Sequence, residues 1–287
     1  MRIKTFFLMT FCCVMGLCLT AQAKVDSELG TSFKSAAAPL DLASSVNGKY
    51  VFVLSKGSVG IYTPDGKLVD AIAVDPSFNR ISVAGLDLAN LEDKIYLSSE
   101  STGKVQEINF SFIVSIDTTA APFLGMPDAP VSIVVFSDFQ CPYCSKLGPT
   151  FDEVLQKNPE TVKVAYKHFP IRGHAQALPA ALAAIAAQKQ GKFWEYHDLL
   201  FQNMRDLKPE KYLELATSLG LNLEQFKKDM ADPQSMAQAS KDQQDGVAAG
   251  VKGTPSIFIN GRNVKDRTAA GMQKLIDEEL AKIRSTK

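Results

Sequence analysis

The stretch Phe136-Ser137-Asp138-Phe139-Gln140-Cys141-Pro142-Tyr143-Cys144 places two cysteines where a predicted strand meets a predicted helix. The run 131–136 before it is rich in β-forming residues, and the run 146–157 after it is helix-like. In this setting Cys-x-x-Cys is typical of a redox-active pair. A zinc site is the alternative, but it would need further ligands at suitable spacing, and the chain has no second cysteine pair outside residues 1–23 and only three histidines.

Residues 1–23 have the pattern of a cleaved secretory signal peptide. Arg2 and Lys4 form a basic start, and the apolar run 6–19 is shorter than the roughly 20 residues that a spanning helix needs. The sequence Ala21-Gln22-Ala23 fits a cleavage site before Lys24. An uncleaved membrane anchor is the alternative. Cleavage predicts an exported, periplasmic protein.

Cleavage changes the cysteine count and the charge. Cys12, Cys13 and Cys18 leave with the signal peptide, so Cys141 and Cys144 are the only cysteines of the predicted mature chain. One pair closing so short a loop removes little entropy from the unfolded chain, so we interpret it as reactive rather than structural. The mature chain has 29 basic and 31 acidic residues. This near balance gives no electrostatic reason to expect nucleic acid as a partner.

The length of 287 residues suggests two domains, and the sequence changes in character between them. Short strands separated by turn residues are predicted at 50–54, 58–62 and 68–74. We therefore predict an all-β N-terminal domain at 24–117. A linker containing three prolines is predicted to follow at 118–130.

The β-rich domain carries an internal repeat. Leu40-Asp41-Leu42-Ala43 recurs 46 positions later as Leu86-Asp87-Leu88-Ala89, and the strands after each copy align as well. A period of about 40–45 residues with four strands per unit is typical of propeller blades, and the segment resembles two NHL or YncE-like blades. A generic antiparallel β domain is the alternative. Because two blades cannot close a ring, their open edges predict a homo-oligomer.

The region 131–287 has an α/β pattern. Its predicted order is a strand at 131–136, the cysteine helix, a strand at 162–166, a helical insertion at about 174–249, a strand at 256–259 and a helix at 269–283. The Asn260-Gly261 pair predicts a hairpin turn after the last strand. This order predicts an α/β thioredoxin fold with an inserted helical domain.

Four sequence segments together resemble the DsbA-like thiol–disulfide oxidoreductases, over roughly residues 123–287. They are Asp138-Phe139-Gln140-Cys141-Pro142-Tyr143-Cys144, Lys167-His168-Phe169-Pro170, Gln190-Gly191-Lys192-Phe193-Trp194-Glu195-Tyr196-His197 and Gly253-Thr254-Pro255-Ser256-Ile257-Phe258-Ile259-Asn260-Gly261. The resemblance implies an exported enzyme that exchanges disulfides with cysteine-containing protein substrates. It also implies a membrane redox partner protein, and neither a cofactor nor a metal.

Each residue of the cysteine motif has an expected role. Cys141 is the expected nucleophile, placed in the first turn of the helix, where free N–H groups and the helix dipole favour a thiolate. Cys144, one turn further along, is expected to resolve mixed disulfides. Pro142 and Tyr143 are expected to set the redox poise and to contact substrate.

Thr254 and Pro255 are the expected counterpart of the cysteines. The resemblance implies a cis Thr254–Pro255 bond opposite the pair, although sequence statistics alone favour trans. The Thr254 backbone would then pair with an extended substrate, and its hydroxyl would contact Cys141. An ordinary turn at the start of the strand is the alternative.

Asp138 has two equally favoured interpretations: an acid that takes the proton of Cys144, or a cap at the end of the strand. Lys167 and His168 could bring positive charge near the thiolate, but a solvated strand end is favoured. His174 and His197 are expected to be hydrogen-bonded or on the surface. The aromatic and leucine-rich run is interpreted as helix core rather than as a peptide groove: Phe193, Trp194, Tyr196, Leu199, Leu200 and Phe201.

These observations favour an oxidase that passes a Cys141–Cys144 disulfide to its substrates. The alternative is a disulfide isomerase or reductase, kept reduced by its partner and oligomerised through the N-terminal domain. A third hypothesis is a non-enzymatic, propeller-like binding module, against which the intact cysteine pair argues.

Overall fold

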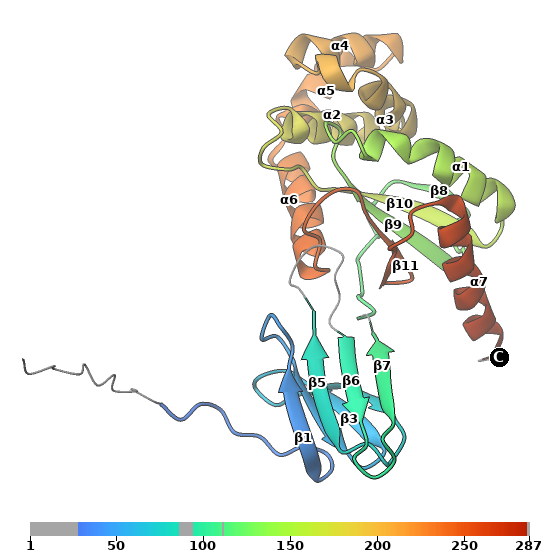
Figure 1. Cartoon of the computed structure of the whole chain (residues 1–287). Coiled ribbons are helices and arrows are strands. Elements are labelled where there is room, and N and C mark those ends of the chain that lie inside the picture. Colours follow the sequence, from blue (N-terminus) through green and yellow to red (C-terminus); the bar gives the residue numbers. More distant parts are fainter. Residues whose placement is uncertain (1–27, 86–93, 111, 286–287) are drawn as a thin grey trace, which may run out of the picture.

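A computed structural model describes residues 28–85, 94–110 and 112–285, and it contains a β-rich part followed by an α/β part (Figure 1). The predicted signal peptide lies outside these residues. Among the helices that are described, none has both the length and the apolar character to cross a membrane.

The β-rich part consists of two antiparallel sheets. The first has the strand order β1 (Pro39–Ser44), β2 (Val51–Ser55), β3 (Ser58–Tyr62) and β4 (Leu68–Ala73). The second has the order β5 (Arg80–Ala84), β6 (Lys94–Ser98) and β7 (Val105–Asn109). The three strands predicted from the sequence correspond to β2, β3 and β4 and are confirmed.

The two sheets share one apolar core. Phe52 and Leu54 of the first sheet are fully buried together with Ile95 and Leu97 of the second. The side chain of Asp41 in β1 accepts a hydrogen bond from the N–H of Ile81 in β5 at 3.0 Å. The sheets therefore form one packed unit rather than two separate ones.

The internal repeat is visible as two similar hairpins. β2–β3 and β6–β7 pair antiparallel at the aligned positions. The first copy of the repeated tetrapeptide lies in β1, whereas its second copy, 86–89, falls outside the described residues. β1 carries the first copy and pairs with β2, but the strand that pairs with β6 in the corresponding place is β5, at 80–84, which precedes the second copy. The resemblance to propeller blades therefore stays a prediction.

The α/β part has the predicted thioredoxin fold, built on a five-stranded sheet of order β12-β11-β9-β10-β8. The strands are β8 (Phe123–Gly125), β9 (Val131–Ser137), β10 (Val162–His168), β11 (Ser256–Ile259) and β12 (Arg262–Asn263). β9 and β10 run parallel, with Ser137 opposite His168, while β11 runs antiparallel to β9. The predicted hairpin after β11 is present, with positive φ at Asn260 and Gly261.

Helices cover both faces of the sheet (Figure 1). They are α1 (Gly148–Lys157), α2 (Ala177–Lys189), α3 (Phe193–Gln202), α4 (Pro209–Ser218), α5 (Leu223–Met230), α6 (Pro233–Ala248) and α7 (Ala269–Ser285). α1 and α7 pack together on one face, and α6 packs along β10 on the other. α2 to α6 lie within the stretch at about 174–249 that was predicted as a helical insertion, between β10 and β11.

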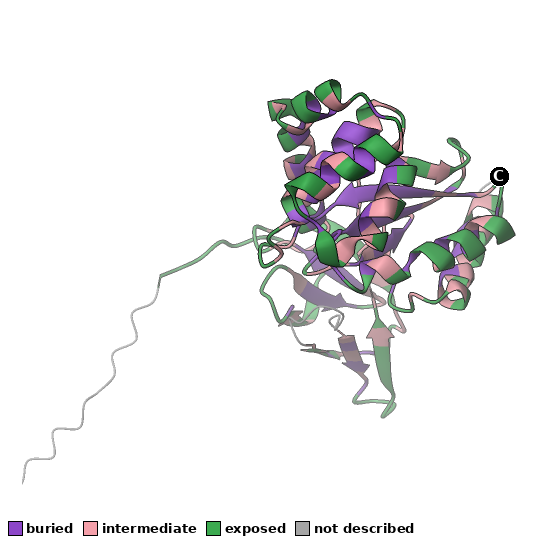
Figure 2. Ribbon diagram, turned by 90° about the horizontal axis from the view of Figure 1, so that it is seen from above, coloured by how far each residue is buried: buried purple, intermediate pink, exposed green. Residues whose placement is uncertain are grey.

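Burial of both faces explains why β9 is an almost continuous apolar run. Ile133 and Val135 belong to the core on the side of α1 and α7, whereas Val134 and Phe136 belong to the smaller core beside α6. A central strand of an α/β sheet needs apolar residues on both faces for this reason. Figure 2 shows the same layering, with buried residues along the sheet and on the inner sides of the helices.

The stretch 118–130, predicted as a linker, is part of the α/β unit. Phe123–Gly125 form β8, which pairs with β10 at the edge of the sheet. The short strand lies between Pro122 and Pro127. Prolines are tolerated beside an edge strand, so the proline content of this stretch did not indicate a linker. Even before this stretch, the N–H of Val114 donates to the carbonyl of Gly261 at 3.0 Å.

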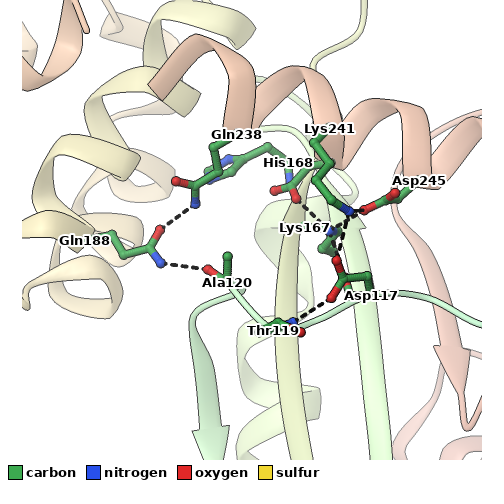
Figure 3. Close-up of polar contacts among 10 residues, drawn as sticks. Asp117, Thr119, Ala120, Lys167, His168, Gln188, Gln238, Lys241 and Asp245 are labelled. Carbon is green, nitrogen blue, oxygen red and sulfur yellow. Dashed lines mark hydrogen bonds and ion pairs between the residues drawn. The ribbon is translucent and has the colours of Figure 1, made fainter. Parts of the chain in front are cut away.

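The residues just before β8 are fixed to the sheet by a set of polar contacts (Figure 3). The carbonyl of Asp117 accepts a hydrogen bond from the Lys167 ammonium at 2.9 Å, and its carboxylate lies 3.0 Å from the Lys241 ammonium. The carbonyl of Ala120 accepts from the Gln188 side chain at 3.0 Å. The chain therefore joins the α/β unit by Asp117 at the latest.

Candidate active site

The cysteine pair lies at the carboxyl end of β9. The Cys141 N–H donates to the Asp138 carbonyl at 3.0 Å, and the Cys144 N–H donates to the Cys141 carbonyl at 3.1 Å. Cys144 begins a short 3-10 segment, and α1 begins only at Gly148, where the following Pro149 fits a first helical turn. The prediction that Cys141 lies in the first turn of the α-helix is therefore wrong, because tight turns separate the strand from that helix.

Thr254 and Pro255 lie directly opposite Cys141. The Thr254–Pro255 peptide bond is cis, as the resemblance implied. The pairing of β11 with β9 sets Ser256 opposite Phe136 and so brings the two segments together. The Cys141 thiol donates to the backbone carbonyl of Thr254 at 3.3 Å. The backbone of Thr254 therefore contacts the sulfur, where the partner in the prediction was its hydroxyl.

The two cysteines are both thiols in the structure, and their environments differ sharply. The pKa of Cys141 is lowered to about 5, first by a hydrogen bond from the Cys144 thiol and then by the Thr254 side chain and the N–H groups of Cys144 and Tyr143. The pKa of Cys144 is raised, first by the same contact with Cys141 and then by burial. Cys141 is thus a thiolate near neutral pH, while Cys144 holds its proton.

Pro142 and Tyr143 form the exposed surface beside Cys141. The Tyr143 side chain is 67% exposed, and the Lys146 ammonium lies 5.7 Å from the centre of its ring. Cys141 itself is only 5% exposed. Pro142 and Tyr143 are thus the exposed residues next to the buried sulfur, and their role in binding substrate stays a prediction.

Asp138 is buried and fully engaged with the loop after β10. One carboxylate oxygen accepts from the N–H of Gln140 at 2.7 Å. The other accepts from the N–H of Ile171 and contacts Nδ1 of His174, both at 2.8 Å. These bonds match the capping interpretation, because neither oxygen is hydrogen-bonded to Cys144.

Lys167 and His168 are neither solvated nor sources of charge for the thiolate, which corrects both interpretations. The Lys167 ammonium is buried and pairs with Asp242 at 2.7 Å and Asp245 at 2.8 Å (Figure 3). The His168 ring is fully buried among aromatic side chains, and this burial lowers its pKa to about 4. The charge of Lys167 is thus balanced by its two ion pairs, and the His168 ring is uncharged.

A cavity of about 750 Å³ lies between α1 and α3 and reaches Cys144. The β-sheet contributes Val135, Ser137 and Tyr166 to its lining. The helices contribute Phe151, Asp152, Trp194, His197, Asp198 and Phe201, and Leu147 lines it from just before α1. The space adjoins Cys144, on the side of the pair that faces the helices.

The aromatic run of α3 is divided between core and cavity. Phe193, Tyr196 and Leu200 are buried in the main core, as predicted. Trp194 and Phe201 are partly buried and pack against this core, and both also line the cavity. Helical spacing indicates which residues face inward, but not that the core beside them is hollow.

Two residues next to Cys144 went unnoticed in the sequence. Ser137 is the last residue of β9, and Tyr166 lies on the neighbouring strand, two positions before the paired end of β10. Both are polar residues near the carboxyl ends of parallel strands, where functional groups gather in α/β sheets. Their position near these strand ends is the sequence signal that could have identified them.

The fold and a cysteine pair facing a cis proline define a thioredoxin-type protein. Residues 117–278, more than half of the chain, match the family described as thioredoxin. The chain belongs to this thioredoxin family.

Two solved structures are similar to this chain. BdbD from Bacillus subtilis, in its oxidised form, is 25% identical, with 60% of this chain and 100% of that chain covered and a TM-score of 0.54. A thioredoxin-like oxidoreductase from Silicibacter pomeroyi DSS-3 is 29% identical, with 56% and 92% covered and a TM-score of 0.50. Both likenesses leave out roughly two fifths of this chain.

Similar curated sequences carry a different name. The Na(+)/H(+) antiporter NhaA 3 of Salinispora tropica is 34% identical over 175 residues, which are 58% of this chain and 27% of that protein. The Na(+)/H(+) antiporter NhaA 1 of Salinispora arenicola is 35% identical over 159 residues, which are 55% and 24%. The chain thus spans about a quarter of the length of these relatives.

Proposed function

We propose that this chain is an exported thiol–disulfide oxidoreductase that exchanges disulfides with protein substrates through Cys141 and Cys144. The observation that carries the proposal is the position of Cys141, whose thiol has a lowered pKa, opposite Thr254 and the cis Pro255. The pKa of Cys141 is about 5, and its sulfur lies 3.3 Å from the Thr254 carbonyl. Nucleophilic attack needs the thiolate, and this site supplies it at neutral pH.

The chemistry follows from the difference between the two sulfurs. In the oxidising direction a substrate thiolate attacks the Cys141 sulfur of the Cys141–Cys144 disulfide, and Cys144 leaves with the electron pair and takes up a proton. A second substrate thiolate then attacks the substrate sulfur of the mixed disulfide. Cys141 leaves as a thiolate, so the substrate gains a disulfide and the protein is reduced by two electrons.

Substrate would lie across Cys141, Thr254 and the exposed pair Pro142 and Tyr143. The Thr254 backbone would pair with an extended peptide, and Tyr143 would offer an apolar ring at the surface. This arrangement contacts main chain more than side chains. It therefore supports exchange with varied cysteine-containing proteins.

Oxidation is the favoured direction. A thiol of low pKa is a good leaving group, so Cys141 releases an oxidised substrate readily. A membrane redox partner protein would then restore the Cys141–Cys144 disulfide in the periplasm. Trapping the redox state of the exported protein tests this direction, and a mostly reduced pool would instead support an isomerase or reductase.

The isomerase or reductase alternative gains support from the β-rich part. Among the described strands, β4 and β7 each have one unpaired edge, which could add strands of a second copy. Light scattering on the chain from Lys24 tests for the homo-oligomer. A monomer well above micromolar concentration would remove this support.

The oxidoreductase proposal is tested by trapping. A Cys144→Ser variant should accumulate mixed disulfides with exported proteins, because Cys141 can attack but no thiol resolves the product. The matched Cys141→Ser variant should trap none, because the buried Cys144 cannot reach substrate. Absence of adducts from the Cys144→Ser variant would refute the proposal.

A further inference from the structure

This inference rests on the proposed function. In that reaction Cys144 must lose a proton in one direction and gain one in the other. It is 3% exposed, and the hydrogen bond with Cys141 and burial both raise its pKa, so the proton does not leave directly to water. Asp138 was one predicted acceptor. Both of its carboxylate oxygens are already occupied by N–H groups and by His174.

The cavity between α1 and α3 offers another path. Ser137 lies beside the Cys144 thiol and also beside Tyr166, and all three residues line the cavity. Tyr166 is 1% exposed, and its hydroxyl has no hydrogen-bond partner of standard geometry within the described residues. A buried hydroxyl without a partner is costly, and cavity water would satisfy it.

A base lies on the same cavity. His197 lines it, with its ring centre 5.3 Å from that of Tyr166 and its side chain 14% exposed. Nδ1 of His197 lies 2.8 Å from a carboxylate oxygen of Asp198, a residue that is largely exposed. Because a carboxylate only accepts, Nδ1 carries a proton and Nε2 remains free to take another.

We propose that this cavity is the proton route of Cys144, and that His197, positioned by Asp198, exchanges the proton through cavity water and the hydroxyls of Tyr166 and Ser137. During resolution the Cys144 proton passes to Nε2 of His197. The electron pair left on Cys144 forms the bond to Cys141, and the substrate sulfur leaves as a thiolate with the pair of the broken bond. The opposite direction returns the proton along the same path.

Five other titratable groups lie around His197. They are Cys144, Asp152, Tyr166, His168 and Asp198. The His168 ring is a weak base, since burial lowers its pKa to about 4, and it does not line the cavity. Asp152 and Asp198 lie at the outer rim, where they can pass protons between His197 and solvent.

The test separates attack by Cys141 from resolution by Cys144. Reduced full-length protein is mixed with increasing oxidised glutathione, and fluorescence is followed by stopped flow. Trp194 is the only tryptophan of the chain and lines the cavity with Cys144, so it reports on the pair. The concentration-dependent phase measures attack, and the plateau rate at high glutathione disulfide measures resolution.

The variant His197→Ala should lower the plateau rate by roughly a hundredfold, the lower end of the range for loss of a general base, with attack unchanged. Added imidazole should restore the rate, because the cavity of about 750 Å³ admits it. The variant Tyr166→Phe should lower the plateau as well. His174→Ala removes the ring of the other histidine–aspartate pair, which does not line the cavity, and should leave the plateau unchanged.

Two results would overturn the inference. One is a plateau in His197→Ala equal to that of the unaltered protein. The other is a slow plateau that imidazole does not restore, which would show a structural rather than a proton-transfer role. Failure of the proposed function looks different, since the unaltered protein would then show no phase that depends on glutathione disulfide.

Discussion

Replacing Cys144 by alanine should raise the pKa of Cys141 substantially. The thiol of Cys144 is the largest single cause that lowers the Cys141 pKa to about 5. A hydrogen bond to a charged group contributes about 1.5–3 kcal/mol. At 1.36 kcal/mol for each pH unit, its loss should move the midpoint by roughly 1–2 pH units. We therefore expect a Cys141 midpoint at roughly pH 6–7 in Cys144→Ala.

The assay is the pH profile of Cys141 alkylation by iodoacetamide, read by mass spectrometry of the peptide that contains Cys141. The midpoint rather than the rate is compared, because the intrinsic nucleophilicity of a thiolate also changes with its pKa. A Cys144→Ser protein is the matched control, since its hydroxyl can still donate to the thiolate. Equal midpoints in the alanine variant and the unaltered protein would refute the reasoning and assign the low pKa to the turn N–H groups.

The following predictions concern stability. The Cys141 pKa of about 5 lies below the ordinary 9.0, so the thiolate stabilises the reduced fold. This contribution is complete above pH 9.0 and is lost as the pH falls through about 5. In urea unfolding between pH 5 and 8, the reduced protein should therefore gain stability with pH relative to Cys141→Ser, and parallel curves would contradict this. Lys167→Ala leaves two aspartates without their buried partner and should lower the free energy of unfolding by about 3–5 kcal/mol, whereas Lys163→Ala on the same strand should change it little. Gly246→Ala would place a methyl group 2.6 Å from the Phe169 ring and should cost about 1–3 kcal/mol, while the glycine at 173 has open space and should accept alanine.

Much of the α/β part could be predicted because its signals are local. The apolar run of β9, the helical spacing of α7 and the Asn260-Gly261 turn each carry their own pattern. The cysteine pair could be found in the same way. The strand β8 could not, because three residues between prolines carry too little periodicity to be distinguished from a loop.

The environment of each site residue was harder to predict than its position. Lys167 looks like a solvated strand end until α6 brings two aspartates to it from far along the chain. Asp138 looks like a free acid until the loop after β10 supplies its partners. Such pairings arise from packing between distant segments, and a single sequence does not record them.

The attachment of the chain at Val114 limits how far the β-rich part can travel. Its N–H is bound to Gly261, in the hairpin that follows β11, and Pro255 directly precedes that strand. Val114 lies five positions after Asn109, the end of β7, so at most about 18 Å of extended chain separates them. The β-rich part is therefore held on a short tether to the same hairpin that continues from the cis proline. The end of β7 is thus kept within that radius of the hairpin that continues from the cis proline.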